Sequence, residues 1–256
     1  MSQRIAICSG KGGVGKTFTS ISIALALSDL GRDVLLVDAD LGLANAQLML
    51  GISPELTIAD YVEGNKTLLE VTNKVDDRLK LIPGASGDAS LANLPLGALS
   101  DLYEEITSTF HDSYIVFDLA AGISNQNMHL LKLCDQRLVL FVDEPASIAD
   151  SYGVLKLLHL SDKLDHTYLV PNQVKNAESG KKFYERMNHL CLSFLGKPVG
   201  FAGAINEDQA VKASIRQRTP INTSFPDSKA WYNVRTIATR IANGVGDTVL
   251  NEDHEH

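Results

Sequence analysis

The stretch Gly-Lys-Gly-Gly-Val-Gly-Lys-Thr at residues 10–17 decides the fold. It follows an apolar run at residues 5–8 and precedes a helical pattern that continues to Leu30. Gly10, Gly15, Lys16 and Thr17 match the spacing G-x-x-x-x-G-K-[ST] of a phosphate-binding loop. Glycines let successive backbone N–H groups curl around an anion, and the following helix turns its positive end toward it. The sequence therefore predicts a phosphate-binding loop.

The residue types in this loop predict separate tasks. The Lys16 ammonium can reach the β- and γ-phosphate oxygens, and the Thr17 hydroxyl can ligate Mg²⁺. A nucleotide phosphate and Mg²⁺ are therefore the expected ligands. The expected nucleotide contacts in this part of the chain are Gly10, Lys11, Gly12, Gly13, Val14, Gly15, Lys16, Thr17 and Phe18.

Length and patterning favour an α/β fold. The 256 residues, 45% of them hydrophobic, can bury a full core and fit one domain, although length alone also allows two small ones. Strands alternate with helices, which favours a single, mostly parallel central sheet flanked by helices on both faces. We expect one P-loop domain over residues 1–243 and an acidic, flexible tail over 244–256. The expected strands are Arg4–Cys8, Asp33–Asp38, Leu79–Ile82, Tyr114–Asp118, Arg137–Val142, His166–Pro171 and Pro198–Ala202.

Charge and cysteine usage limit the class of protein. A formal net charge of −8 argues against a surface that coats DNA, because nonspecific binding depends on Lys and Arg. Lys212, Arg216 and Arg218 form a local basic cluster, for which a solvated helix face is favoured over a DNA site. The three cysteines show no metal-ligand spacing, and no apolar run reaches the ~20 residues of a spanning helix. We expect a cytoplasmic protein with reduced thiols.

Acidic side chains follow two of the expected strands. Asp38 and Asp40, two residues apart, end one strand, and Asp118 ends another. Their side chains should meet at the carboxyl edge of the sheet, beside the phosphate-binding loop. This placement suits phosphoryl transfer, in which positioning and charge neutralisation supply most of the catalysis. Alternatively, Asp38 or Asp40 caps a helix that begins near Leu41.

A second lysine, Lys11, lies inside the loop. With it, residues 11–17 match the pattern K-G-G-x-G-K-[ST], so the chain resembles the MinD/ParA family of P-loop ATPases, which carry this deviant Walker A motif. The resemblance implies a homodimer that closes around ATP, with Lys11 reaching the partner's nucleotide. It also implies that Asp38 lies near the water shell of the metal and that Asp40 orients the attacking water. The catalytic residues expected from it are Lys11, Lys16 and Asp40.

Later segments resemble the remaining functional elements of that family. Asp118 would hold Mg²⁺ through water, and the Gly122 N–H could turn toward a γ-phosphate because glycine tolerates unusual backbone angles. The metal site would thus comprise Thr17, Asp38 and Asp118, and the residues of the switches and the dimer interface would be Asn45, Gly122, Glu144 and Asp150.

Two loops resemble the adenine-contacting segments of the family. The Asn172 amide can donate to and accept from a base edge. Asn206, Glu207 and Asp208 match a second loop, with Asn206 where the family usually has proline.

Within the family, residues 38–45, 83–87, 120–124, 143–148 and 225–230 resemble the FlhG (FleN) branch. This implies an ATPase with slow regulatory hydrolysis that controls flagellar number, placement or gene expression. The implied partners are a flagellar transcription regulator, a flagellar switch-ring protein and the GTPase FlhF, with polar location through a partner. Members of the family carry an N-terminal extension that stimulates FlhF, whereas the first expected strand begins within a few residues of Met1, so we do not expect FlhF stimulation through that segment.

Other functions stay open. A ParA-type partitioning ATPase would need the Lys212–Arg218 region to bind DNA, which is possible but not favoured. A nitrogenase-type iron protein or another metabolic P-loop enzyme is a third class, but Cys134 has no obvious companion cysteine. Stable membrane binding is not expected, because the apolar positions from Trp231 to Ile241 favour a helix packed on the core over a membrane-surface helix.

Overall fold

An eight-stranded sheet organises the chain in a computed structural model that describes residues 3–40, 44–85, 91 and 94–244. The strand order is β3-β4-β2-β5-β1-β6-β7-β8, and all neighbours are parallel except β3 and β4. The strands are β1 (Arg4–Ser9), β2 (Val34–Ala39), β3 (Asn73–Lys74), β4 (Leu79–Ile82), β5 (Tyr114–Ala121), β6 (Gln136–Phe141), β7 (Thr167–Pro171) and β8 (Gly200–Phe201).

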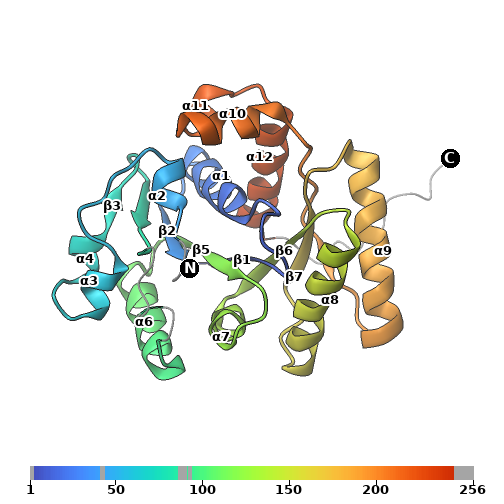
Figure 1. Cartoon of the computed structure of the whole chain (residues 1–256), viewed down its shortest axis with the longest axis horizontal. Coiled ribbons are helices and arrows are strands. Elements are labelled where there is room, and N and C mark those ends of the chain that lie inside the picture. The colour runs from blue at the N-terminus through green and yellow to red at the C-terminus, as the bar shows by residue number, and fades with distance from the viewer. Residues whose placement is uncertain (1–2, 41–43, 86–90, 92–93, 245–256) are drawn as a thin grey trace.

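Helices cover both faces of this sheet (Figure 1). In that view, α1 (Lys16–Asp29), α10 (Gln209–Gln217), α11 (Ile221–Ser224) and α12 (Lys229–Ala242) lie above it. On the opposite side lie α6 (Leu96–Thr109), α7 (Asn125–Leu133) and α8 (Pro145–Leu160), with α9 (Ala177–Leu195) beside α8. The short helices α2 (Ala46–Met49), α3 (Ile58–Val62) and α4 (Leu68–Val71) precede the β3 edge.

The predicted fold class is confirmed, and all seven expected strands are present. The boundaries of β4 are as predicted and those of the other strands differ by at most two residues, except that β5 continues to Ala121 because it also pairs with Ser9 of β1. The edge strand β3 is an addition that apolar patterning did not indicate, since its two residues are polar. The predicted tail, residues 244–256, lies outside the described residues apart from Gly244.

Two apolar cores sandwich the sheet. One packs α6, α7, α8 and α9 against the strands, and the other packs α1 and α12. The predicted core positions of α12, namely Trp231, Val234, Ile237, Ala238 and Ile241, are buried in the second core, which confirms a core helix. No described helix is long and apolar enough to cross a membrane.

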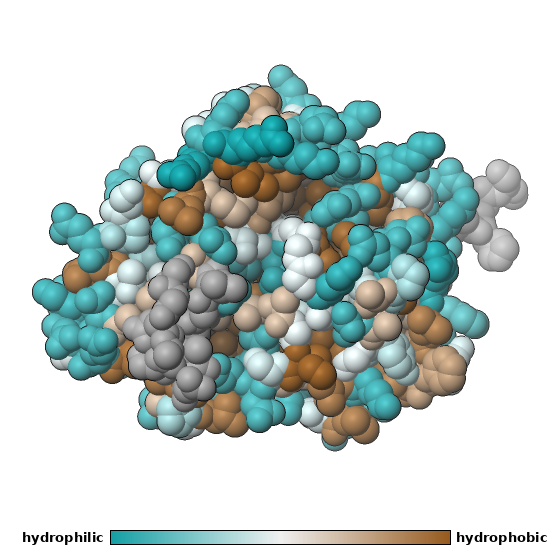
Figure 2. Space-filling view, in the orientation of Figure 1, coloured by the Kyte–Doolittle hydropathy of each residue, from teal (hydrophilic) through white to brown (hydrophobic). Residues whose placement is uncertain are grey.

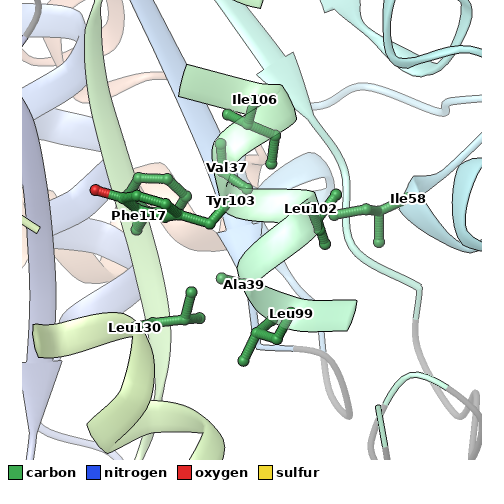
Figure 3. A pocket seen from close by; sticks show the side chains of 9 residues that line it. All are labelled: Val37, Ala39, Ile58, Leu99, Leu102, Tyr103, Ile106, Phe117 and Leu130. Carbon is green, nitrogen blue, oxygen red and sulfur yellow. The ribbon is translucent and has the colours of Figure 1, made fainter. Parts of the chain in front are cut away.

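A small cavity of about 10 Å³ lies in the first core, where α6 meets β2 and β5 (Figure 3). Its lining side chains are apolar or aromatic, and the Tyr103 hydroxyl donates to the Leu133 carbonyl. A space of this size without polar partners does not suit a water molecule, so it is a packing defect and not a ligand site.

The surface is mixed in character. Figure 2 shows hydrophilic residues around small, separate hydrophobic groups on one face of the molecule, and the top, over α10 and α11, is largely hydrophilic. Lys212, Arg216 and Arg218 are exposed on and just after α10, and Lys212 lies 3.3 Å from Glu207. The cysteines Cys8, Cys134 and Cys191 are buried and unpaired.

Candidate nucleotide-binding site

The predicted phosphate-binding loop joins β1 to α1 at the carboxyl edge of the sheet. Gly13 and Gly15 have φ of 80° and 95°, values that favour glycine. Gly15 is the N-cap of α1, so the backbone turns sharply into the helix N-terminus. Val14 anchors the loop in the core, whereas Gly12 and Gly13 are exposed. This conformation leaves backbone N–H groups of the loop available to an anion.

Three contacts fix the loop from behind. A Cβ at Gly10 would lie 2.2 Å from the backbone carbon of Asp150, so only glycine lets α8 approach this closely. The Asn172 Nδ2 donates to the Val14 carbonyl at 2.7 Å. The Ser9 hydroxyl donates to the Lys11 carbonyl at 2.7 Å. Helix α8, the residue that follows strand β7, and the last residue of strand β1 therefore fix the position of the loop.

Asn172 thus has a role that its sequence context did not reveal. It is buried, and its Oδ1 also accepts from the Gln173 N–H at 2.8 Å. The predicted contact of Asn172 with adenine stays a prediction. It would have to use the remaining hydrogen-bonding capacity of the amide, which supports the loop at the same time.

Asp38 and Asp118 lie side by side beneath the loop. They are paired in the register of β2 and β5, and both are essentially fully buried. Burial raises the pKa of each carboxyl, and the proximity of Asp118 raises that of Asp38 further. A cation would relieve this repulsion and favour both charged forms.

The surroundings of Asp118 fit a Mg²⁺ ion. Its Oδ1 accepts from the Ser20 hydroxyl at 2.8 Å, and Thr17 also donates to this carboxylate. Its Oδ2 is buried without a hydrogen-bonding partner. An orphaned carboxylate oxygen beside a threonine hydroxyl is the hard-oxygen environment that Mg²⁺ prefers. The predicted proximity of Thr17 and Asp118 is therefore found, and Ser20 is a supporting residue that the loop motif did not indicate.

Asp38 organises the segment after β2. Its Oδ2 accepts from the N–H groups of Asn45 and Ala46, at 2.9 Å each, and its Oδ1 accepts from that of Asp40 at 3.3 Å. Asp38 therefore binds the start of α2, which resembles the capping alternative, although this helix begins at Ala46 and not near Leu41. Residues 41–43 lie outside the described residues. Asp40 is half-buried, and its task of orienting water stays a prediction.

The segment after β5 is fixed by hydrogen bonds at both sides. Gly122, with φ of 90°, donates its N–H to the Ser9 carbonyl at 2.9 Å. Asn127, a buried residue of α7, directs its amide at the carbonyls of residues 120–122. Sequence reasoning singled out Gly122 but missed Asn127, because an asparagine in the first turn of a helix ordinarily indicates only local capping.

The residues predicted at the dimer interface gather beside the loop. The Lys11 Nζ lies 2.6 Å from Glu144 Oε2 within the same chain. Glu144 directly precedes α8, and Asp150 is an exposed residue of that helix. Asn45 lies at the start of α2, on the Asp38 side of the loop.

Hydrogen bonds within the chain hold the second predicted adenine loop in place. The Asn206 N–H donates to Asn233 Oδ1 at 3.0 Å, and Asp208 caps α10 through the Ala210 N–H at 2.9 Å. Glu207 is exposed. Asn206 forms an isolated bridge with Val174 in the segment that follows β7, two residues beyond Asn172. The contacts of this loop with a base stay a prediction.

Comparison with known families matches residues 5–221 to the CobQ/CobB/MinD/ParA nucleotide binding domain. The chain belongs to this family. The resemblance to MinD/ParA proteins that Lys11 and the loop indicated is thereby confirmed.

Individual relatives agree with the predicted branch. The chain is 33% identical to the antiactivator FleN of Pseudomonas aeruginosa over 93% of this chain and 86% of FleN. It is 30% identical to the flagellum site-determining protein YlxH of Helicobacter pylori, over 91% of this chain and 80% of the relative. The solved structure of the MinD cell division protein from Aquifex aeolicus superposes with a TM-score of 0.77 at 26% identity, covering 94% of this chain and 97% of that one. The MinD-like fold and the resemblance to FlhG/FleN proteins are confirmed.

Proposed function

We propose that this chain is a MinD-like ATPase that dimerises around ATP and so regulates flagellar number, placement or gene expression through a protein partner. The observation that carries the proposal is the convergence of the Gly10–Thr17 loop, Asp38 and Asp118 at one sheet edge, in a chain similar to FleN and YlxH. Slow hydrolysis would act as a timer that reopens the dimer.

The residues of the loop divide the binding task. Backbone N–H groups from Gly12 to Gly15 and the N-terminus of α1 would surround the phosphates, and Lys16 would neutralise the β- and γ-phosphate charge. Asn172 would support this geometry from below through Val14. Thr17 and Asp118 would hold Mg²⁺, whose chemistry when bound is neutralisation of charge between the terminal phosphates.

Hydrolysis would depend on residues of the two switch segments. Asp40 would orient the attacking water, and Asp38 would keep Asp40 near the site by binding its N–H and the start of α2. Gly122 would offer its N–H to the γ-phosphate. Lys11 would leave Glu144 and cross to the partner's nucleotide, which makes the closed state dependent on a second chain.

The test of this function is a search for partners of the trapped state. Asp40→Ala protein, held with ATP, is recovered from lysate of the native cell, and co-purifying proteins are identified by mass spectrometry. Lys16→Ala serves as the control because it removes the charge needed for phosphate binding. Flagellar regulators or switch-ring proteins specific to Asp40→Ala would support the proposal.

The same experiment tests the alternative, ParA-type partitioning. Chromosome-associated proteins and DNA, recovered in place of flagellar proteins, would contradict the flagellar proposal. The exposed basic residues Lys212, Arg216 and Arg218 would then be the surface to neutralise. Binding through them should weaken steeply as salt rises.

A further inference from the structure

One peptide group in the segment after β5 is held at both of its polar atoms. The group joins Ala121 to Gly122. Its N–H donates to the Ser9 carbonyl at 2.9 Å, and its carbonyl oxygen accepts from Asn127 Nδ2 at 3.3 Å. Because a peptide group is planar and rotates as a unit, neither atom can be redirected without disturbing the other's hydrogen bond.

Asn127 is well placed to act as a clamp, that is, as a side chain that holds this peptide group in one orientation. It is the third residue of α7 and only 4% exposed. Its Nδ2 also lies 2.9 Å from the Ala120 carbonyl and 3.3 Å from that of Gly122. The side-chain amide of asparagine has two N–H donors, so the three carbonyl oxygens share these two donors, and the bond to Ala120 is the shortest. The Ser124 hydroxyl accepts from the Asn127 N–H at 3.2 Å and fixes the start of the helix.

The acceptor of the Gly122 N–H, the Ser9 carbonyl, lies directly before the phosphate-binding loop. Ser9 is fully buried, and while its carbonyl accepts from Gly122, its hydroxyl donates to the Lys11 carbonyl at 2.7 Å. The Gly122 N–H is thus occupied by a protein acceptor at the edge of the nucleotide site. A Cβ placed at Gly122 would meet nothing within 4 Å, so the space beside this Cα is open.

We propose that Asn127 is a positioning residue that holds the Ala121–Gly122 peptide in the orientation it has without a γ-phosphate. Asn127 thereby lowers the affinity for ATP relative to that for ADP. The inference rests on the proposed function, in which Gly122 turns its N–H toward a γ-phosphate. That rotation exchanges the Ser9 bond for a bond to phosphate and strains or breaks the Asn127 bond to Ala121. A ligand shifts such an equilibrium only by its differential affinity, so the clamp opposes ATP and leaves ADP unaffected.

The test compares nucleotide affinities of Asn127→Ala and Asn127→Ser with those of wild type. Dissociation constants for a non-hydrolysable ATP analogue and for ADP, each with Mg²⁺, are measured by titration calorimetry. Asn125→Ala is the matched control, because Asn125 is an exposed residue at the start of the same helix. Asn127→Ala should raise the analogue-to-ADP affinity ratio about three- to tenfold, the range expected from one or two neutral hydrogen bonds, and Asn127→Ser should give a smaller rise.

The readout separates positioning from general support of the fold. A residue that merely stabilises the site would weaken both nucleotides together and leave their ratio unchanged, which would overturn the inference. A ratio that falls in Asn127→Ala would also overturn it. Should Asn127→Ala fail to fold, Asn127→Ser, which keeps one donor, decides by the same ratio. A wild-type protein that binds neither nucleotide would refute the proposed function itself, whereas intact wild-type binding with an unchanged ratio refutes only the role of Asn127.

Discussion

The Lys11 ammonium lies 2.6 Å from the Glu144 carboxylate within a single chain. Both residues were predicted to reach across a dimer interface, and in the isolated chain they face each other. Since Lys11 cannot hold Glu144 and a partner's nucleotide at once with the same geometry, the proposed closure of the dimer would have to replace this ion pair. The single chain therefore has a resting arrangement in which both candidate interface residues are already engaged.

This ion pair should contribute little to stability. Lys11 and Glu144 side chains are 39% and 57% exposed, and exposed pairs are worth about 0.2–1 kcal/mol. Lys11→Ala, Glu144→Gln and the double variant should therefore each lower the free energy of unfolding by less than about 1 kcal/mol in urea denaturation. A coupling energy well above that range in the double-mutant cycle would mean that the pair is a structural element of the fold and not a displaceable contact.

Gly10 and Gly12, in the same loop, should respond differently to alanine. A Cβ at Gly10 would collide with the backbone of Asp150 in α8, which cannot yield as a flexible side chain can, whereas a Cβ at Gly12 meets nothing within 4 Å. Gly10→Ala should cost about 1–3 kcal/mol of unfolding free energy or more, by the measure of overpacked cores. Gly12→Ala should stay within about 0.5 kcal/mol of wild type, as changes away from contacts do. Equal losses in urea denaturation would show that α8 does not constrain the loop in this way.

The acidic pair predicts how the metal-free protein responds to pH. Burial raises the pKa of Asp38 to about 7 and that of Asp118 to about 6. Groups with raised pKa stabilise the fold fully below their ordinary pKa near 4, and this contribution is lost as pH rises through 6 and 7. Unfolding free energy in EDTA should therefore fall on the order of a few kcal/mol between pH 4 and pH 7.5.

A neutral variant isolates the contribution of this pair from other titrating groups. Asp38→Asn keeps the side-chain size but removes one charge, so its unfolding free energy should fall less over the same pH interval. Addition of Mg²⁺ and nucleotide should also reduce the fall in wild type, because bound ligand stabilises the charged carboxylates. Parallel pH profiles for Asp38→Asn and wild type would contradict the assignment.

The fold and the centre of the site could be predicted because local patterns report them. Apolar runs that end in Asp38 and Asp118, and a glycine loop that ends in Lys16 and Thr17, identify strands and a ligand edge directly. The support for that edge depends on contacts between distant segments, and these leave no local pattern. Asn172 beneath Val14 and Asn127 beneath the turn at Gly122 are examples.

Asp38 and Asp118, which both follow apolar runs in the sequence, differ in their surroundings in the structure. Asp38, part of a predicted metal site, accepts three hydrogen bonds from the backbone N–H groups of Asp40, Asn45 and Ala46. In contrast, one carboxylate oxygen of Asp118 has no hydrogen-bonding partner. Composition and spacing treat two buried strand-end aspartates alike. Only the packing of the segments around them separates an organising carboxylate from one available to a cation.

Light scattering in the presence of Mg²⁺ and ATP tests the central claim most directly. The comparison is between Asp40→Ala and Lys11→Ala, with each variant also measured in ADP. An ATP-dependent switch predicts that Asp40→Ala accumulates as a dimer in ATP, because hydrolysis no longer reopens it, and that Lys11→Ala stays monomeric in both nucleotides. Equal dimer fractions for the two variants in ATP would contradict this division of roles and the dimerisation switch that depends on it.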